Sequence, residues 1–142
     1  MHLNKIEAQL RRDEGEKLSA YQDHLGYWTI GVGRLIDARK GGGLTREEST
    51  YLLQNDIMSK TKELNSKLSW ISTLDPVRRA VLVNMAFQMG VEGLLKFRNT
   101  LAMIKAGQYA DAASGMLESL WAQQTPARAQ RLSTQMRTGV WQ

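Results

Sequence analysis

The chain has 142 residues, of which 42% are hydrophobic and 23% charged, and its formal net charge is +5. It contains no Cys and only two His, His2 and His24, so disulfides and thiol chemistry are excluded and a zinc site is disfavoured. No segment approaches the roughly 20 apolar residues that span a bilayer, so we expect a single domain over residues 1–142 with no metal, no organic cofactor and no membrane insertion.

The first predicted element is a helix that ends at an acidic residue. Leu3, Ile6 and Leu10 recur at helical spacing, and Gly15 can adopt the left-handed conformation that ends a helix. Glu14 therefore lies at the helix end, where the negative end of the helix dipole disfavours a carboxylate. This uncommon placement makes Glu14 a candidate functional acid, and an exposed Glu without a role is the alternative.

A hairpin is predicted next, over residues 18–35, which are rich in strand formers. Asp23-His24-Leu25-Gly26 has the composition of a β-turn, which places Asp23 at the bend. Gly31 and Gly33 within the strand pattern indicate a bulge or a close approach of the backbone to another group. The third glycine and the following long helix of a dinucleotide site are missing, so that kind of site is excluded.

After a glycine-rich loop at residues 40–43, the rest of the chain is predicted to be helical. The motif Thr45-Arg46-Glu47-Glu48 is typical of a capping box, which opens a helix over residues 45–68. Asp75-Pro76 starts a helix that is apolar nearly all round and stops at Gly90, so we expect it to be central and buried. Further helices are expected over residues 100–106, 110–121 and 126–139.

These elements predict an α+β fold in which a small N-terminal lobe carries the hairpin. The helix of residues 45–68 is long enough to join this lobe to a mostly helical C-terminal lobe. The approximate limits of the lobes are 14–50 and 60–142, in addition to the N-terminal helix. A cleft between two lobes is a common place for a substrate site.

Glu14 and Asp23 are candidate acids for cleaving the bond between two sugars. That reaction needs a proton donor for the leaving oxygen and a second carboxylate that activates water or attacks the sugar. A carboxylate at a helix end and another in the following turn could face each other across a groove. The chain has 14 Asp and Glu, however, so the placement of this pair does not by itself establish the reaction.

Motifs in the same order along nearly the whole chain resemble those of the phage lysozymes, a family of muramidases. In the N-terminal part they are DEG at residues 13–15, YQD at 21–23 and GYWTIGVG at 26–33. In the C-terminal part they are LDPVRRA at residues 74–80, NMAFQMG at 84–90, FRNTL at 97–101, WAQQTP at 121–126 and RTGVW at 137–141. The resemblance implies a lysozyme-like fold and hydrolysis of the glycan strands of peptidoglycan.

The resemblance implies catalytic roles for three residues of the N-terminal part. Glu14 would be the general acid that protonates the oxygen between N-acetylmuramic acid and N-acetylglucosamine, and Asp23 would be its ionised partner. Thr29 matches the family's catalytic threonine, whose hydroxyl can hold the attacking water, or is simply a β-branched residue that suits a strand. The family inverts the anomeric centre, which implies carboxyl groups roughly 6.5–9.5 Å apart.

Substrate contacts are implied by the resemblance at Leu35, Phe87 and Thr100. Thr100 stands where a family member has Ser, which preserves a hydroxyl. Gly115 stands where that member has Asn, so one polar contact is missing. For Phe87, packing in the core is the alternative to a place in the sugar cleft.

Two arginines, Arg34 and Arg128, have candidate ion-pair partners. Arg34 stands where the family pattern Gly-x-Gly-His has His, and the partner of that His corresponds to Asp56. An Arg34–Asp56 pair would keep its positive charge at ordinary pH and tether the hairpin to the long helix, so we expect a structural role. Arg128 could pair with Asp13 or Glu14, or belong to a solvated basic stripe.

The hypothesis that follows is an endolysin-type muramidase that acts as a monomer on the β-1,4-linked glycan strands and lyses the host. The charged N-terminal segment has no apolar stretch typical of a signal peptide. We therefore expect synthesis in the host cytoplasm and access to the wall after another protein permeabilises the membrane. The positive net charge suits an anionic wall.

Two other classes of function stay open. A protein with this fold could only bind peptidoglycan, or cleave it by a transglycosylase route that needs only the acid, although Asp23 and Thr29 favour hydrolysis. Residues 110–137 superficially resemble a nucleic-acid-binding helix-turn-helix, but aromatic and basic residues do not alternate there. We therefore expect no nucleic acid as a partner.

Overall fold

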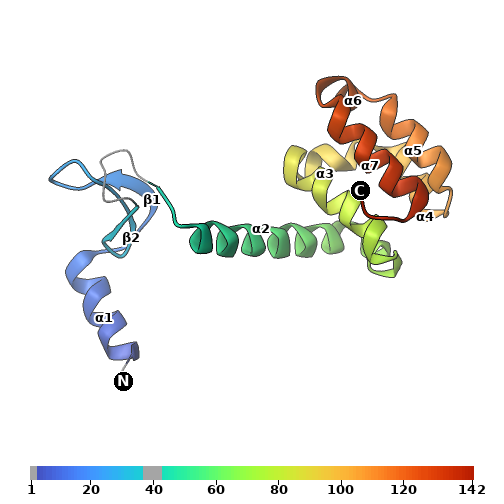
Figure 1. The fold of residues 1–142 in the computed structure, drawn as a ribbon. Coiled ribbons are helices and arrows are strands. Elements are labelled where there is room, and N and C mark those ends of the chain that lie inside the picture. Colours follow the sequence, from blue (N-terminus) through green and yellow to red (C-terminus); the bar gives the residue numbers. More distant parts are fainter. Residues whose placement is uncertain (1–2, 37–42) are drawn as a thin grey trace. The chain divides into compact units, whose positions relative to one another are not determined.

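The computed structural model describes residues 3–36 and 43–142 of the chain. Most of the glycine-rich loop expected at residues 40–43 therefore lies outside the described residues. The chain divides into two compact units, Met1–Leu52 and Leu53–Gln142 (Figure 1). The strands all belong to the first unit and the described elements of the second are helices, which confirms the predicted α+β class.

The first unit contains a helix, a three-stranded antiparallel sheet with strand order β1-β2-β3, and the start of a second helix (Figure 1). Its elements are α1 (Leu3–Glu14), β1 (Lys17–Gln22), β2 (Trp28–Gly31) and β3 (Arg34–Leu35). α1 ends as predicted, because Gly15 has a φ of +76° and its N–H donates to the carbonyl of Arg11 at 3.0 Å. The hairpin of β1 and β2 is confirmed, and β3 is a short third strand that the sequence pattern did not predict.

α2 (Arg46–Lys67) begins in the first unit and continues into the second. The N–H of Thr45 donates to Glu48 Oε1 at 3.0 Å, and the N–H of Glu48 donates to Thr45 Oγ1 at 3.2 Å. These reciprocal hydrogen bonds satisfy two backbone donors that the first helical turn leaves free. The predicted capping box and the predicted long helix are both confirmed.

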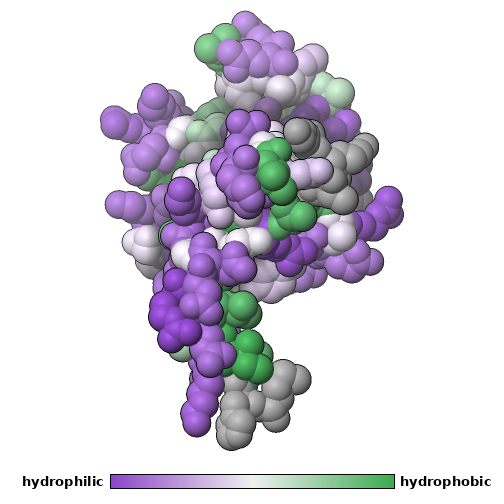
Figure 2. All heavy atoms as spheres, turned by 90° about the vertical axis from the view of Figure 1, so that its left-hand side faces the viewer, coloured by the Kyte–Doolittle hydropathy of each residue, from purple (hydrophilic) through white to green (hydrophobic). Residues whose placement is uncertain are grey.

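The first unit buries little of its apolar surface. Leu3, Ile6 and Leu10, which form the apolar stripe of α1, are exposed within it. Figure 2 shows apolar side chains along one side of α1, at the bottom of the view, and polar ones along the other. Thr29 is the only buried residue among those that the structure describes in this unit. A segment of this size is too small to enclose a core of its own.

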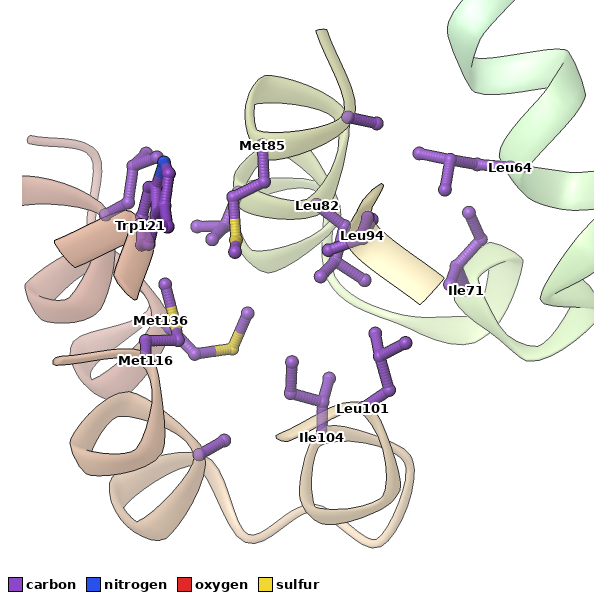
Figure 3. Close-up of a cluster of buried hydrophobic side chains, with 14 of the residues drawn as sticks. Leu64, Ile71, Leu82, Met85, Leu94, Leu101, Ile104, Met116, Trp121 and Met136 are labelled. Carbon is purple, nitrogen blue, oxygen red and sulfur yellow. The ribbon is translucent and has the colours of Figure 1, made fainter. Parts of the chain in front are cut away.

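The second unit contains the hydrophobic core. After the end of α2 its elements are a 3-10 helix (Ser69–Thr73), α3 (Pro76–Leu95), α4 (Arg98–Lys105), α5 (Tyr109–Leu117), α6 (Leu120–Gln124) and α7 (Pro126–Thr138). Side chains from all of these helices pack together, among them Leu64, Ile71, Leu82, Met85, Leu94, Leu101, Ile104, Met116, Trp121 and Met136 (Figure 3). The indole N–H of Trp121 donates to Gln88 Oε1 at 2.8 Å, so this buried polar group is satisfied.

α3 is the central buried helix that the sequence predicted. It starts at Asp75, whose Oδ2 accepts the N–H of Arg78 at 3.0 Å, and Pro76 occupies its first position. Gly90 has non-helical angles (φ 79°, ψ 159°) at the predicted stop, but helical geometry resumes after it and continues to Leu95. The sequence predicted that the helix ends at Gly90, but in the structure this residue forms a kink within α3.

The single helix expected over residues 110–121 is two helices, α5 and α6. Ser119 has an extended backbone and its Oγ accepts the N–H of Ala122 at 3.2 Å, so it ends one helix and caps the next. α7 starts at Pro126 and is followed by left-handed Gly139, as predicted. Among the described residues, no single helix is long and apolar enough to cross a membrane; α3 and α4 meet that requirement only as a pair, bent by 104°.

Candidate active site

Glu14 is the last residue of α1, and it is exposed within the first unit. The charged residues beside it pair with each other, Arg11 with Glu16 and Arg12 with Asp13. Among the described residues of this unit, no side chain forms an ion pair or a hydrogen bond with Glu14. Its carboxyl group is therefore free to exchange a proton with a ligand.

The side chain of Glu14 lies against the backbone of Gly33, in the turn between β2 and β3. A Cβ atom built on Gly33 would lie 2.7 Å from Glu14 Oε2 and 3.0 Å from its Cδ, so any larger residue would displace the carboxylate. Gly33 also has a φ of +64°, in the left-handed region that glycine adopts without strain. The predicted close approach of the backbone to another group is confirmed at Gly33, and that group is the carboxylate of Glu14.

Asp23 occupies the bend between β1 and β2, as predicted. Its Oδ1 accepts the backbone N–H groups of Leu25 and Tyr27, both at 2.9 Å. The turn closes through the N–H of Gly26, which donates to the carbonyl of Asp23 at 3.0 Å. These contacts fix the direction of the carboxylate, and its other oxygen, Oδ2, has no hydrogen bond to a described residue.

Thr29 is connected to Asp23 through the backbone of Tyr27. The Thr29 hydroxyl donates to the carbonyl of Tyr27 at 3.1 Å, and that carbonyl also accepts the N–H of Asp23 at 2.9 Å. Thr29 lies on β2, opposite Leu35 of β3, and is only 3% exposed, whereas Leu35 is exposed. Because the hydroxyl gives its proton to a carbonyl, its lone pairs can still accept a hydrogen bond from water.

Arg34 connects β3 to the first turn of α2 through an ion pair with Glu48. The N–H and the hydroxyl of Thr45, followed by the charge of Arg34, hold the pKa of Glu48 below its usual value of 4.5. Glu48 was predicted only as a member of the capping box, and Asp56 as the partner of Arg34. The structure shows Glu48 as a partner of Arg34, and an Arg34–Asp56 pair stays a prediction.

Phe87 and Arg128 line a pocket of about 490 Å³ in the second unit. Phe87 is 42% exposed, which favours a place at the surface over packing in the core. Arg128 donates to Asn84 Oδ1 through Nε at 3.0 Å and Nη2 at 2.6 Å, so its described partner is an amide. The pocket has the size of a ligand site, and we identify the candidate active site from the carboxylates of the first unit instead.

Thr100, the third predicted substrate contact, is buried in α4 with 7% exposure. Its Oγ1 would lie 3.1 Å from a Cβ atom built on Gly115 of α5. Thr100 and Gly115 were predicted as separate positions, and the structure brings them together. The burial favours a role in packing, and a contact of Thr100 with sugar stays a prediction.

The first unit thus carries the groups that hydrolysis of an acetal requires. Among the described residues of this unit, Glu14 offers a carboxyl group without an ion pair or hydrogen bond, Asp23 offers an oriented carboxylate whose Oδ2 accepts no hydrogen bond, and Thr29 offers a hydroxyl connected to Asp23. Sequence reasoning missed the backbone of Tyr27 as the link, since no side-chain property signals it. Among residues 3–36 and 43–142, no group of three or more His, Cys, Asp and Glu side chains could hold a metal ion.

Known proteins are similar to nearly the whole chain. The family model described as phage lysozyme matches residues 11–137. The chain is 36% identical to "probable T4-type lysozyme 1" of Dictyostelium discoideum, over 97% of this chain and 96% of that protein. It is also 36% identical to the "pre-baseplate central spike protein Gp5" of Enterobacteria phage T4, over 92% of this chain and 27% of that protein. An "endolysin" of Acyrthosiphon pisum secondary endosymbiont phage 1 is 26% identical over 77% of this chain and 73% of its own length.

Proposed function

The chain belongs to the phage lysozyme family and is a lysozyme-type glycoside hydrolase of peptidoglycan, and we propose that it cleaves the β-1,4 bond between N-acetylmuramic acid and N-acetylglucosamine with inversion. One observation carries this proposal: Asp23 and Thr29 are hydrogen-bonded to the same residue, Tyr27, in the unit that also carries the exposed carboxyl group of Glu14. A hydrolase needs a proton donor and, separately, groups that direct water. Glu14 is the candidate proton donor, and Asp23 and Thr29 are the candidate groups that direct water.

In the proposed mechanism Glu14 protonates the glycosidic oxygen as the bond to the leaving sugar breaks. The ionised carboxylate of Asp23 stabilises the positive charge that develops on the other sugar. A water molecule donates one hydrogen bond to Asp23 Oδ2 and another to Thr29 Oγ1, and its oxygen attacks the anomeric carbon. Asp23 then takes the proton of the attacking water.

Inversion follows from attack on the face opposite the leaving group. It requires a separation of roughly 6.5–9.5 Å between the two carboxyl groups, so that sugar and water both fit. The fixed direction of the Asp23 carboxylate supports this geometry, because a rigid acceptor can hold water in one position. Leu35, Phe87 and Thr100 are the proposed substrate contacts.

We propose that the protein acts as a monomer on the wall of its host, after another protein has opened the membrane. The similarity to an endolysin supports this role. The distribution of charge supports it as well: the first unit has 8 Lys and Arg and 8 Asp and Glu, and the second has 11 Lys and Arg and 6 Asp and Glu. The net charge of +5 therefore lies on the second unit, where it attracts an anionic polymer.

Clearing of permeabilised cells tests the proposal with wild type, Glu14→Gln and Asp23→Asn. Both substitutions keep the shape of the side chain, so the fold is expected to survive while activity falls at least about 100-fold. Glu16→Gln, which neutralises an exposed acid two residues from Glu14, is the matched control and should stay active. Wild-type clearing by Glu14→Gln would contradict the assignment of the acid.

The products distinguish hydrolysis from its alternatives. Hydrolysis with inversion yields new reducing ends that are first released as the α-anomer, which proton NMR detects during digestion of purified glycan strands. Anhydro-sugars would instead indicate a transglycosylase. Binding to the wall without any product would indicate a module that only binds.

A further inference from the structure

The position of Glu14 depends on a contact outside its own helix. α1 ends at this residue, and in the first unit no described side chain pairs with it. Within the described residues of the first unit its carboxylate lies against Gly33, where the missing Cβ leaves room for it. A general acid must be held in one place to be effective, so whatever fixes Gly33 also fixes the acid.

The turn that contains Gly33 is followed by a strand of only two residues. β3 pairs with β2 through Ile30–Arg34 and Thr29–Leu35, and the N–H of Ile36 donates to the carbonyl of Trp28 at 2.9 Å. A two-residue strand contributes few hydrogen bonds, and strands this short need further contacts to stay in place. Arg34, the residue directly after Gly33, supplies one of these contacts.

Arg34 reaches from β3 to Glu48, which is itself fixed at the start of α2. Glu48 Oε1 accepts the N–H of Thr45 while Oε2 pairs with Arg34, so one carboxylate caps the helix and holds the strand. Glu48 is three-quarters buried, with a side chain 24% exposed. The Arg34 side chain is 61% exposed, so the strength of the contact comes from its charge: a charged hydrogen bond is stronger and more directional than one between neutral groups.

We propose that Gly33, Arg34 and Glu48 are positioning residues for Glu14. In this arrangement Glu48 fixes Arg34, Arg34 fixes the adjoining turn, and Gly33 in that turn supports the carboxylate of the acid. The inference rests on the proposed function, which gives Glu14 the role of proton donor. It goes beyond that function because none of the three residues touches the reacting atoms.

The first test compares Gly33→Ala with Gly31→Ala. Gly33 and Gly31 both have a positive φ (+64° and +69°), so alanine at either position causes similar backbone strain. Only at Gly33 would the new methyl group meet Glu14. For Gly33→Ala we expect kcat to fall about tenfold or more, with KM within about twofold. Gly31→Ala should lose similar thermal stability and keep kcat within about twofold.

The second test compares Glu48→Gln with Glu47→Gln. In Glu48→Gln the new amide oxygen still accepts the N–H of Thr45, but the side chain no longer carries the charge that holds Arg34, whereas Glu47 is exposed in the same turn. We expect kcat to fall about threefold in Glu48→Gln and not in Glu47→Gln. Arg34→Gln should give the same loss, and combining it with Glu48→Gln should add nothing further.

The carbon-13 chemical shift of the Glu14 carboxyl group, measured at one pH in all of these full-length variants, provides a readout independent of activity. The proposal predicts a changed shift in Gly33→Ala and Glu48→Gln and an unchanged one in Gly31→Ala and Glu47→Gln. Matching shifts within each pair, together with matching kcat values, would overturn the inference and leave the proposed function intact. Changed shifts in Gly33→Ala and Glu48→Gln, together with a wild-type protein that cleaves no glycan, would overturn the function and leave the positioning intact.

Discussion

Asp23 and Tyr27 are joined by a pair of hydrogen bonds across one turn. The N–H of Tyr27 donates to Asp23 Oδ1 at 2.9 Å, and the N–H of Asp23 donates to the carbonyl of Tyr27 at 2.9 Å. The carboxylate of Asp23 is therefore part of the turn as well as a candidate catalytic group. Two different substitutions of Asp23 can therefore separate its contribution to stability from its contribution to catalysis.

Asp23→Asn should abolish activity with little loss of stability, because the amide oxygen can accept the same two N–H groups without the charge. Asp23→Ala should also lower the free energy of unfolding by about 1–2 kcal/mol, since two backbone donors lose their acceptor. Urea unfolding and the rate of glycan cleavage measure the two effects. An active Asp23→Asn would remove the carboxylate from the mechanism.

Arg78→Met should destabilise the second unit. The Arg78 guanidinium donates to the carbonyls of Met136 (2.7 Å) and Arg137 (3.1 Å), pairs with Asp75 at 3.2 Å, and lies 3.8 Å from the centre of the Tyr109 ring. Its side chain is only 17% exposed, so we expect a loss of about 2–4 kcal/mol in the free energy of unfolding. Arg131→Met, at an exposed site of α7, is the control, and an equal effect of both changes would refute this role.

The free energy of unfolding should decrease as the pH falls, partly because Asp75 becomes protonated. Burial raises the pKa of Asp75, but hydrogen bonds from the Arg78 N–H and guanidinium, with the charge of Arg78, outweigh it and hold the pKa below its usual 3.8. Because the folded pKa is the lower one, this stabilisation is complete above the unfolded pKa and is lost as the pH falls through the folded pKa. Asp75→Asn still caps α3, so its free energy of unfolding should fall less steeply below about pH 4 than that of wild type. Parallel curves would show that Asp75 makes no such contribution.

Gly115→Ala and Thr100→Ala should be coupled. Alanine in a helix interior is favoured over glycine by about 1 kcal/mol, but a Cβ atom at position 115 would lie 3.1 Å from Thr100 Oγ1. We expect Gly115→Ala to be nearly neutral in the wild-type background and to stabilise by about 1 kcal/mol when Thr100→Ala has removed the hydroxyl. A double-mutant cycle by chemical denaturation measures the coupling, and strictly additive effects would mean that the two residues do not interact.

The sequence alone determined the features of this protein that depend on neighbours along the chain. The end of α1 at Gly15, the turn at Asp23, the capping box of Thr45 and Glu48 and the cap at Asp75 each join residues at most four apart. At that range the residue type and the backbone geometry suffice to define the conformation. The break at Ser119 has the same local origin, but it was not predicted, because apolar residues continue on both sides of it.

Only the tertiary structure decided which distant groups meet. The resemblance made Asp56 the predicted partner of Arg34, and the structure shows a pair with Glu48 that was not predicted, because the position of β3 brings Arg34 to the first turn of α2. The sequence suggested that something approaches Gly33, but not that it is the carboxylate of Glu14. Contacts of this kind depend on how whole segments pack, which is set by many weak interactions at once and leaves no signature in any one stretch of residues.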